Sequence, residues 1–171
     1  NLLFFDAKTG EKAFCINRKG QGPEDYISVG ALVMDEKAGE IFAWDIMHGT
    51  FQVYDEHGKF LRTLQLHNKR KDEYLYITNF INLDDDQLLC SSHNIKGYAV
   101  HYLQDKKTGL TTIVDSIPNE RYVNQYIFAE KDGVTYSTAP NLIPFVRISE
   151  GLVYADHSND TLYRMNDGMT P

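Results

Sequence analysis

The chain has 171 residues, which is enough for one domain with a sizeable hydrophobic core. Its 17 Lys and Arg residues and 24 Asp and Glu residues give a net charge of −7, which argues against a nucleic-acid binder because such proteins need a basic surface. No stretch approaches the ~20 consecutive apolar residues of a membrane span, and 11 Tyr with nine Phe favour strands over helices.

The chain begins with a predicted strand hairpin. Residues 2–5 and 13–16 are apolar and aromatic, and a polar turn that contains Gly10 joins them. The chain does not begin with Met, so we expect a leader or a further domain upstream. The following loop contains Gly20, Gly22 and Pro23, which fix an irregular backbone path. It is not a nucleotide-binding fingerprint, because no P-loop lysine and no helical pattern follow it.

Two units of four predicted strands come next. The first unit has strands at residues 31–34, 41–44, 51–54 and 60–66, and the second has strands at residues 76–83, 87–91, 98–103 and 110–117. The first two strands of the first unit are nearly continuous apolar runs, so we expect both of their faces to be covered. The fourth strand alternates and should be more exposed. The turn Asp84-Asp85-Asp86 lacks the pattern of a calcium loop and is interpreted as a solvated turn.

The pattern is less regular after Pro118. Apolar side chains at positions 122, 123, 126 and 127 also suit one face of a short helix, but we prefer a strand that enters a turn at residues 131–133. Further strands are predicted at residues 134–137, 145–148, 152–155 and 161–165. Cys15 and Cys90 lie in apolar strands of different units, which favours buried free thiols over a disulfide.

One hairpin, residues 51–66, sets the pattern for the chain because its tight Asp-containing turn at Gly58 recurs in weaker form. The equivalent turn glycines, Gly10, Gly58, Gly109 and Gly168, are separated by 48, 51 and 59 residues. Such spacing is typical of β-propeller blades, each made of four antiparallel strands. The alternative is that similar hairpins simply recur in an all-β protein. We predict an all-β chain with blades at residues 1–19 (the end of a blade), 27–67, 75–117 and, less regularly, 122–171.

The number of blades is too small for a closed ring. At roughly 50 residues per blade, the chain holds about three and a half blades, whereas propellers usually have about four to eight. We therefore expect a fragment of a propeller. Its open strand edges would be able to pair with another chain.

Residues 20–26, Gly-Gln-Gly-Pro-Glu-Asp-Tyr, resemble the G-x-G-P-x-E-Y-type loop of TolB-like six-bladed β-propeller proteins, with Glu-Asp-Tyr where Gly-Glu-Tyr is commoner. The strands that carry Asp35 and Trp44-Asp45, the turn at residues 54–59 and the closing segment at residues 159–165 are also similar. The resemblance implies a six-bladed propeller of Bacteroides-type bacteria. It also implies a periplasmic or outer-surface location and a lipid anchor in a removed leader. The activity of this family is largely uncharacterised, so the resemblance implies no catalytic residue.

Strand direction indicates where a site would lie. In a blade, the turns after the first and third strands lie at one end, and the turn after the second strand and the connections between blades lie at the other. Binding residues favour loops on a rigid scaffold, so we expect the second end to bind a protein or glycan partner without catalysis or a cofactor. The expected contact residues are Arg18, Glu24, Asp25, Tyr26, His48, His93 and His157. Trp44 and Tyr98 would add contacts unless they pack between blades.

The alternative hypothesis is a metal-dependent, lactonase-like hydrolase or lyase with a divalent ion such as Ca²⁺ in the central channel. Its oxygen ligands would be Asp45, Asn94, Asn141 and Asp156. The competing explanation is that each of these residues caps its own turn. The six His residues include no H-E-x-x-H motif, and no G-x-S-x-G motif is present, so zinc and serine-hydrolase chemistry have no support.

Overall fold

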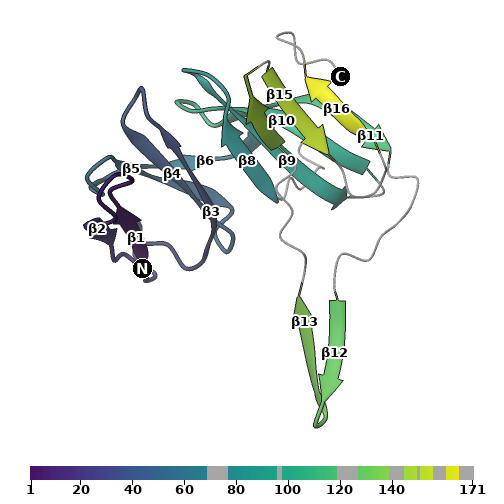
Figure 1. Ribbon diagram of the computed structural model, residues 1–171, viewed down its shortest axis with the longest axis horizontal. Helices are drawn as coiled ribbons and strands as arrows, with labels where there is room; N and C mark the ends of the chain where they lie inside the picture. Colours follow the sequence, from purple (N-terminus) through teal and green to yellow (C-terminus); the bar gives the residue numbers. More distant parts are fainter. Residues whose placement is uncertain are drawn as a thin grey trace.

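The computed structural model describes residues 1–68, 77–95, 98–118, 127–138, 145–149, 151–155 and 161–165. These residues form strands and turns and contain no helix (Figure 1). The strands form five sheets, in which all but one of the pairings are antiparallel. The prediction of an all-β chain is therefore confirmed, and every strand predicted in these parts of the sequence is present.

The first sheet is a four-stranded antiparallel meander. It comprises β3 (Val29–Asp35), β4 (Glu40–Asp45), β5 (Thr50–Asp55) and β6 (Phe60–Gln65), in the order β3-β4-β5-β6. A hairpin of β1 (Leu2–Phe5) and β2 (Lys12–Ile16) precedes it. The aromatic and β-branched residues of these segments suit pleated, half-buried strands, which is why the sequence signal was strong here.

The second sheet is a similar meander with one additional strand. It contains β8 (Asn79–Asn82), β9 (Gln87–Ile95), β10 (Tyr98–Asp105) and β11 (Leu110–Pro118). The short strand β7 (His67–Asn68) pairs in parallel with β11, and the His67 N–H donates to the carbonyl of Gly109 at 2.7 Å. Sequence reasoning missed β7 because two residues cannot show a periodicity. This strand ties the chain that leaves the first sheet to the edge of the second.

Two smaller sheets follow. The hairpin of β12 (Ile127–Lys131) and β13 (Val134–Thr138) turns through Asp132 and Gly133, whose φ angles are +53° and +74°. Two successive positive φ angles suit the tight two-residue turns of hairpins. The predicted strand before this turn is confirmed from Ile127, and residues 122–126 lie outside the described part. The last sheet contains β14 (Phe145–Ile148), β15 (Gly151–Ala155) and β16 (Leu162–Met165).

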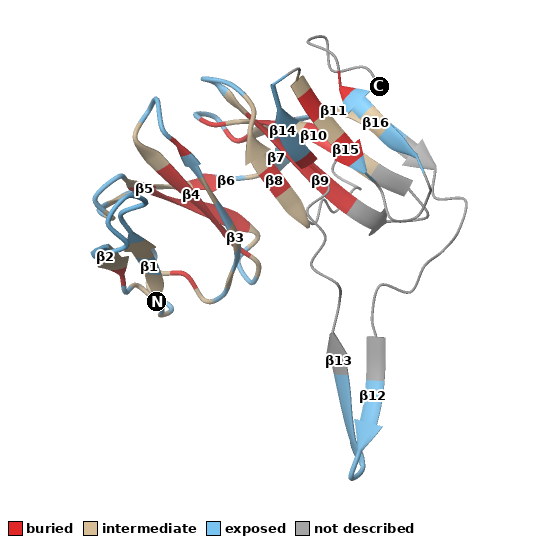
Figure 2. Cartoon of the chain, viewed as in Figure 1, coloured by how far each residue is buried: buried red, intermediate tan, exposed pale blue. Residues whose placement is uncertain are grey.

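The sheet of β3–β6, the sheet of β8–β11 and the sheet of β14–β16 pack in this order, and most residues coloured as buried lie on their strands (Figure 2). The cluster between the first and second sheets includes Phe42, Phe51 and Tyr102, whereas Leu89 and Tyr154 lie in the cluster between the second sheet and the sheet of β14–β16. The β1–β2 hairpin covers the other face of the first sheet. Because side chains alternate along a strand, the middle sheets need apolar residues on both faces.

The structure corrects one expectation about burial. The strand at residues 31–34 is not covered on both faces, because Leu32 and Met34 are 45% and 41% exposed. The strands buried on both faces are β4 and β5, and β6 is more exposed, as predicted. The reason is the position of β3 at the edge of its sheet, since the N-terminal hairpin packs on Ile41 and Tyr54 of the neighbouring strands instead.

The repeated hairpin turn is confirmed at three of its four sites. Gly10, Gly58 and Gly109 have φ angles of +72°, +83° and +73°, which favour glycine, and Gly168 lies outside the described residues. In each turn one Asp carboxylate accepts backbone N–H groups from residues that follow it. The recurrence therefore reflects a shared device, an Asp that caps its own turn, although the glycine follows the Asp by four residues at Gly10 and Gly109 and by three at Gly58.

A buried ion pair joins the first two sheets at one end. The Lys106 Nζ lies 2.6 Å from the Asp35 carboxylate, and both side chains are 3% exposed. Lys106 Nζ also donates to the main-chain oxygen of Asp84. Burial favours a higher pKa for Asp35, but its hydrogen bonds, mainly from Lys106, outweigh burial and lower that pKa. These contacts confirm that the turns after the first and third strands share one end in these two sheets.

Further polar contacts reinforce this end. Arg62 binds Glu40 in a bidentate pair at 2.6 and 2.8 Å and also donates to the carbonyl of Lys106 at 3.1 Å. The predicted solvated turn at residues 84–86 is exposed; Asp85 and Asp86 pair with surface lysines, and the Asp84 carboxylate accepts the N–H groups of Asp86 and Gln87. The end of the stack that carries these turns is therefore held by charge-assisted hydrogen bonds.

The buried pair leads to a stability prediction. Lys106→Met leaves the Asp35 carboxylate buried without its cation, so we expect the free energy of unfolding to fall by about 3–5 kcal/mol. Combining Lys106→Met with Asp35→Asn should recover much of the loss because the unpaired charge is removed. Urea unfolding measures both, and Lys37→Met, which breaks an exposed pair, is the matched control with a far smaller effect. Equal losses for Lys106→Met and Lys37→Met would contradict the role of the buried pair.

Candidate functional site

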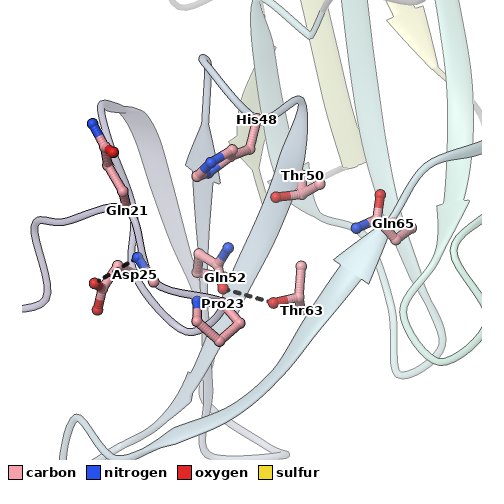
Figure 3. Close-up of a pocket in the computed structure, with 9 residues that line it drawn as sticks. Gln21, Pro23, Asp25, His48, Thr50, Gln52, Thr63 and Gln65 are labelled. Carbon is pink, nitrogen blue, oxygen red and sulfur yellow. Dashed lines mark hydrogen bonds between the residues drawn. The ribbon is translucent and has the colours of Figure 1, made fainter.

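A polar pocket lies at the opposite end of the first sheet, between the loop of residues 20–26 and strands β5 and β6 (Figure 3). Its volume is about 280 Å³. Most of its lining side chains end in an amide, a hydroxyl, a carboxylate or an imidazole. The lining residues are Gln21, Gly22, Pro23, Asp25, His48, Thr50, Gln52, Thr63 and Gln65.

The sheet supplies two rows of these side chains. Thr50 pairs with Gln65 across β5 and β6, and Gln52 pairs with Thr63. The side-chain period of two places Thr50, Gln52 and Tyr54 on one face of β5. Tyr54 is buried in the core between the sheet and the N-terminal hairpin. This face of β5 therefore changes from core to pocket lining towards the start of the strand.

The glycines of the loop make room for Asp25. Its carboxylate accepts the N–H of Gly22 at 3.0 Å, and the Asp25 N–H donates to the carbonyl of Gly22 at 3.1 Å. A Cβ atom would lie 2.3 Å from this carboxylate at Gly20 and 2.9 Å at Gly22. The Gly-x-Gly spacing therefore lets a side chain fold back over the loop, which accounts for the motif without a bound phosphate.

Tyr26 anchors the loop from inside. It is 3% exposed, packs in the core with Ile16, and donates its hydroxyl to the Ile16 carbonyl at 3.3 Å. The expectation that Tyr26 offers its ring to a partner is therefore wrong, because the ring is part of the core. Arg18 and Glu24 form an exposed ion pair at 2.6 Å and are not among the pocket-lining residues.

The centre of the site is the pair formed by Asp45 and His48. The Asp45 side chain has no exposure, and its carboxylate lies 2.6 Å from His48 Nδ1. It also accepts the backbone N–H groups of Ile27, Ser28 and Met47 at 2.9, 3.1 and 3.2 Å. Burial favours a higher pKa for Asp45, but these bonds outweigh it, so the pKa is lowered. Asp45 is therefore a fully bonded, ionised carboxylate.

The turn that carries this pair is a variant of the repeated turn. At residues 6–10, 45–49 and 105–109 the glycine N–H donates to the carbonyl of the first Asp, at 2.8 to 3.0 Å. The fourth position is Thr9 or Thr108 in two of these turns, and the Thr108 hydroxyl donates to its Asp at 2.8 Å. His48 occupies that position here. The replacement of Thr by His within a D-x-x-T-G turn is the signal that sequence reasoning missed.

Thr50 has a buried hydroxyl at the pocket. The residue is 4% exposed, and its Oγ1 has no hydrogen-bond partner among the residues that the structure describes. By contrast, the neighbouring Gln52 Oε1 accepts the hydroxyl of Thr63 at 2.9 Å. Buried polar groups in folded proteins almost always have a partner. Thr50 Oγ1, itself shielded from solvent, is therefore a polar atom without a described partner in the wall of this pocket.

The expected metal ligands are described in part. Both carboxylate oxygens of Asp45 accept hydrogen bonds, so Asp45 caps its own turn. Asn141, Asp156 and His157 lie outside the described residues, and for His93 and Asn94 only the backbone, within β9, is described. In the described ranges, no three or more His, Cys, Asp or Glu side chains are grouped to hold a metal ion.

Two other sequence expectations concern packing. Trp44 is 2% exposed and packs on Phe51 with ring centroids 5.0 Å apart, so it is a residue of the interface between sheets, and the side chain of Tyr98 lies outside the described part. Cys15 and Cys90 are free thiols, as expected. Burial raises the pKa of the Cys90 thiol.

The lowered pKa of Asp45 predicts part of the acid sensitivity. Because its folded-state pKa lies below the ordinary 3.8, Asp45 stabilises the fold above that pH, and this stability is lost as pH falls through the folded-state pKa. Asp45→Asn should reduce stability at pH 7 by at least about 1–3 kcal/mol, since the amide cannot satisfy the same donors.

Urea unfolding between pH 2 and pH 7 checks this expectation. The Asp45→Asn variant should show a shallower loss of stability at acid pH than the unaltered protein. Asp85→Asn, at an exposed carboxylate, is the control and should leave the profile unchanged. Parallel profiles for Asp45→Asn and the unaltered protein would show that this carboxylate does not stabilise the fold through its charge.

Comparisons with known proteins identify a family but no characterised relative. The whole chain, residues 1–171, matches a family model described as "Domain of unknown function (DUF4934)". No curated protein and no solved structure matches the chain. Across the residues that the structure describes, no helix has the length and apolarity to cross a bilayer. The chain belongs to the DUF4934 family.

Proposed function

We propose that this chain forms blades of a β-propeller and acts as a non-catalytic module that binds a glycan in the pocket at Asp45 and His48. The observation that carries the proposal is the pocket itself, a hollow of about 280 Å³ lined mainly by amide and hydroxyl side chains. Pockets for drug-sized ligands have volumes of about 300–1,000 Å³, so this one suits a single sugar unit.

The order and packing of the strands support the propeller part of the proposal. Two successive meanders stack face to face, and their first strands, β3 and β8, lie close together. First strands that converge are expected around the central channel of a propeller. The outer faces of the stack carry exposed apolar side chains, including Leu32, Met34, Val146, Ile148 and Leu162. A neighbouring blade on each side would bury these side chains.

The chemistry of the lining supports a glycan as the ligand. Sugar hydroxyls donate and accept hydrogen bonds, and the amides of Gln21, Gln52 and Gln65 offer both functions. Thr50 adds a hydroxyl without a partner in the described part of the chain. Among the described lining residues, Pro23 has the one side chain that is wholly apolar, so a hydrophobic ligand or peptide anchor would gain little here. A location in the bacterial envelope, as the resemblance implies, would place the pocket among glycans.

NMR titration tests the proposal directly. We expect glucose, galactose, mannose or N-acetylglucosamine to shift the amide signals of the pocket-lining residues in ¹⁵N-labelled protein. A glycan array of neutral oligosaccharides extends the search to longer ligands. Absence of binding to every neutral sugar in both assays would contradict the proposal. If a protein partner is added instead and shifts amide signals over a wide surface outside the pocket, the protein-binding form of the module is favoured.

Thr50→Val separates ligand binding from folding. The change removes a buried hydroxyl without a described partner, so we expect the free energy of unfolding to stay the same or to rise by up to about 1 kcal/mol. Affinity for the bound sugar should fall by about 5- to 10-fold through the loss of one hydrogen bond. Thermal unfolding and the NMR titration provide the two readouts.

The matched control is Thr112→Val, at an exposed position of β11 in the second sheet. It should change neither the affinity nor the stability appreciably. A marked destabilisation by Thr50→Val would instead show that the Thr50 hydroxyl is bonded within the folded protein, which would remove it from the binding site.

A further inference from the structure

The imidazole of His48 contacts the Asp45 carboxylate, whose orientation is fixed by its other hydrogen bonds. Asp45 accepts three backbone N–H groups in addition to the ring, and its side chain has no exposure. The rotation of this carboxylate is therefore fixed by the turn and by the incoming chain at Ile27 and Ser28. Such a group orients an imidazole in the same way as the carboxylates behind many functional histidines.

The contact also fixes which ring nitrogen carries the proton. An ionised carboxylate only accepts hydrogen bonds, so the nitrogen that faces Asp45, Nδ1 at 2.6 Å, must be the donor. In the neutral ring the other nitrogen, Nε2, then has a lone pair and acts as an acceptor. His48 lines the pocket and its side chain is 38% exposed, so a ligand in the pocket can reach the ring (Figure 3).

The charges around the pocket favour uncharged ligands over anionic ones. Two carboxylates, Asp25 in the lining and Asp45 behind His48, are negative, and no Lys or Arg is among the described residues that line the pocket. A carboxylate, sulfate or phosphate on the ligand would therefore meet like charge without a compensating cation. A hydroxyl group, which can donate to an acceptor and also accept from Thr50, has neither disadvantage.

From this geometry we infer that the pocket selects uncharged sugars through a sugar hydroxyl that donates to His48 Nε2, with Asp45 as the positioning residue. This inference rests on the proposed glycan-binding function. It adds to the proposed function the class of sugar, the acceptor atom that recognises a sugar hydroxyl and the reason why acidic sugars bind poorly.

The tautomer is tested without any ligand. Long-range ¹H–¹⁵N NMR of the histidine rings at pH 8 should show His48 with a proton on Nδ1 and none on Nε2. His57, which is 82% exposed at the turn of the β5–β6 hairpin, provides the comparison ring. Asp45→Asn should shift the proton of His48 away from Nδ1. A His48 ring protonated at Nε2 in the unaltered protein would overturn the inference and leave the glycan proposal standing.

The repeated turn supplies an unusually well-matched variant. His48→Thr restores the D-x-x-T-G sequence found at residues 6–10 and 105–109, where a Thr hydroxyl donates to the Asp. The turn should therefore fold normally while Nε2 is lost. We expect thermal unfolding close to that of the unaltered protein and at least a 10-fold loss of affinity for the neutral sugar. His57→Gln is the control that removes an exposed imidazole and should bind normally.

Sugar specificity completes the test. At pH 8 the protein should bind glucose at least 10-fold more tightly than glucuronic acid, and any other neutral sugar that binds should lose affinity when the contacting hydroxyl is replaced by hydrogen. Equal binding of glucose and glucuronic acid, or full binding by His48→Thr, would overturn the inference alone. Failure of every neutral sugar to bind would overturn the glycan proposal, and the inference with it.

Discussion

The buried carboxylate of Asp45 is the point on which both the local fold and the site depend. It closes its own turn through Met47 and holds the chain entering the first sheet through Ile27 and Ser28. That segment continues the loop that carries Gln21 and Asp25. The Asp45 carboxylate therefore contacts both the segment after this loop and the turn before β5, the two elements that flank the pocket. It also orients His48. A group with this many charge-assisted bonds positions its partners more rigidly than an exposed ion pair would.

The hydrophobic core is preserved in spite of the polar pocket. Strand β5 buries Phe51 and Val53 against the second sheet and Tyr54 against the N-terminal hairpin, so the core remains continuous behind the pocket. On the pocket face of β5 and β6, polar side chains replace apolar ones at the two residue pairs nearest this end of the sheet, Thr50–Gln65 and Gln52–Thr63. At the opposite end, the Lys106–Asp35 pair ties the first sheet to the second. The polar pocket and the buried ion pair therefore lie at opposite ends of the first sheet.

Sequence reasoning identified the strands and the Asp-Gly turns because these depend on local properties, namely alternation, aromatic content and glycine at positive φ. It could not predict which faces neighbouring sheets cover. For this reason it wrongly expected Leu32 to be covered and Tyr26 to be exposed to a partner. It named Asp45 and His48 but assigned them to separate hypotheses, because residue types alone do not reveal a contact. A comparison of the D-x-x-T-G turns would have indicated the contact between Asp45 and His48. His48 occupies the position of Thr108, whose hydroxyl donates to the Asp of its own turn.

The central claim is that His48, oriented by Asp45, receives a sugar hydroxyl in a polar pocket of the first sheet. The most direct measurement is a crystal structure of the chain grown with glucose, galactose and mannose. We expect one sugar in the pocket, with a ring hydroxyl within hydrogen-bonding distance of His48 Nε2 and another near Thr50 Oγ1. A sugar bound at another surface, or in the pocket without contact to His48, would contradict it.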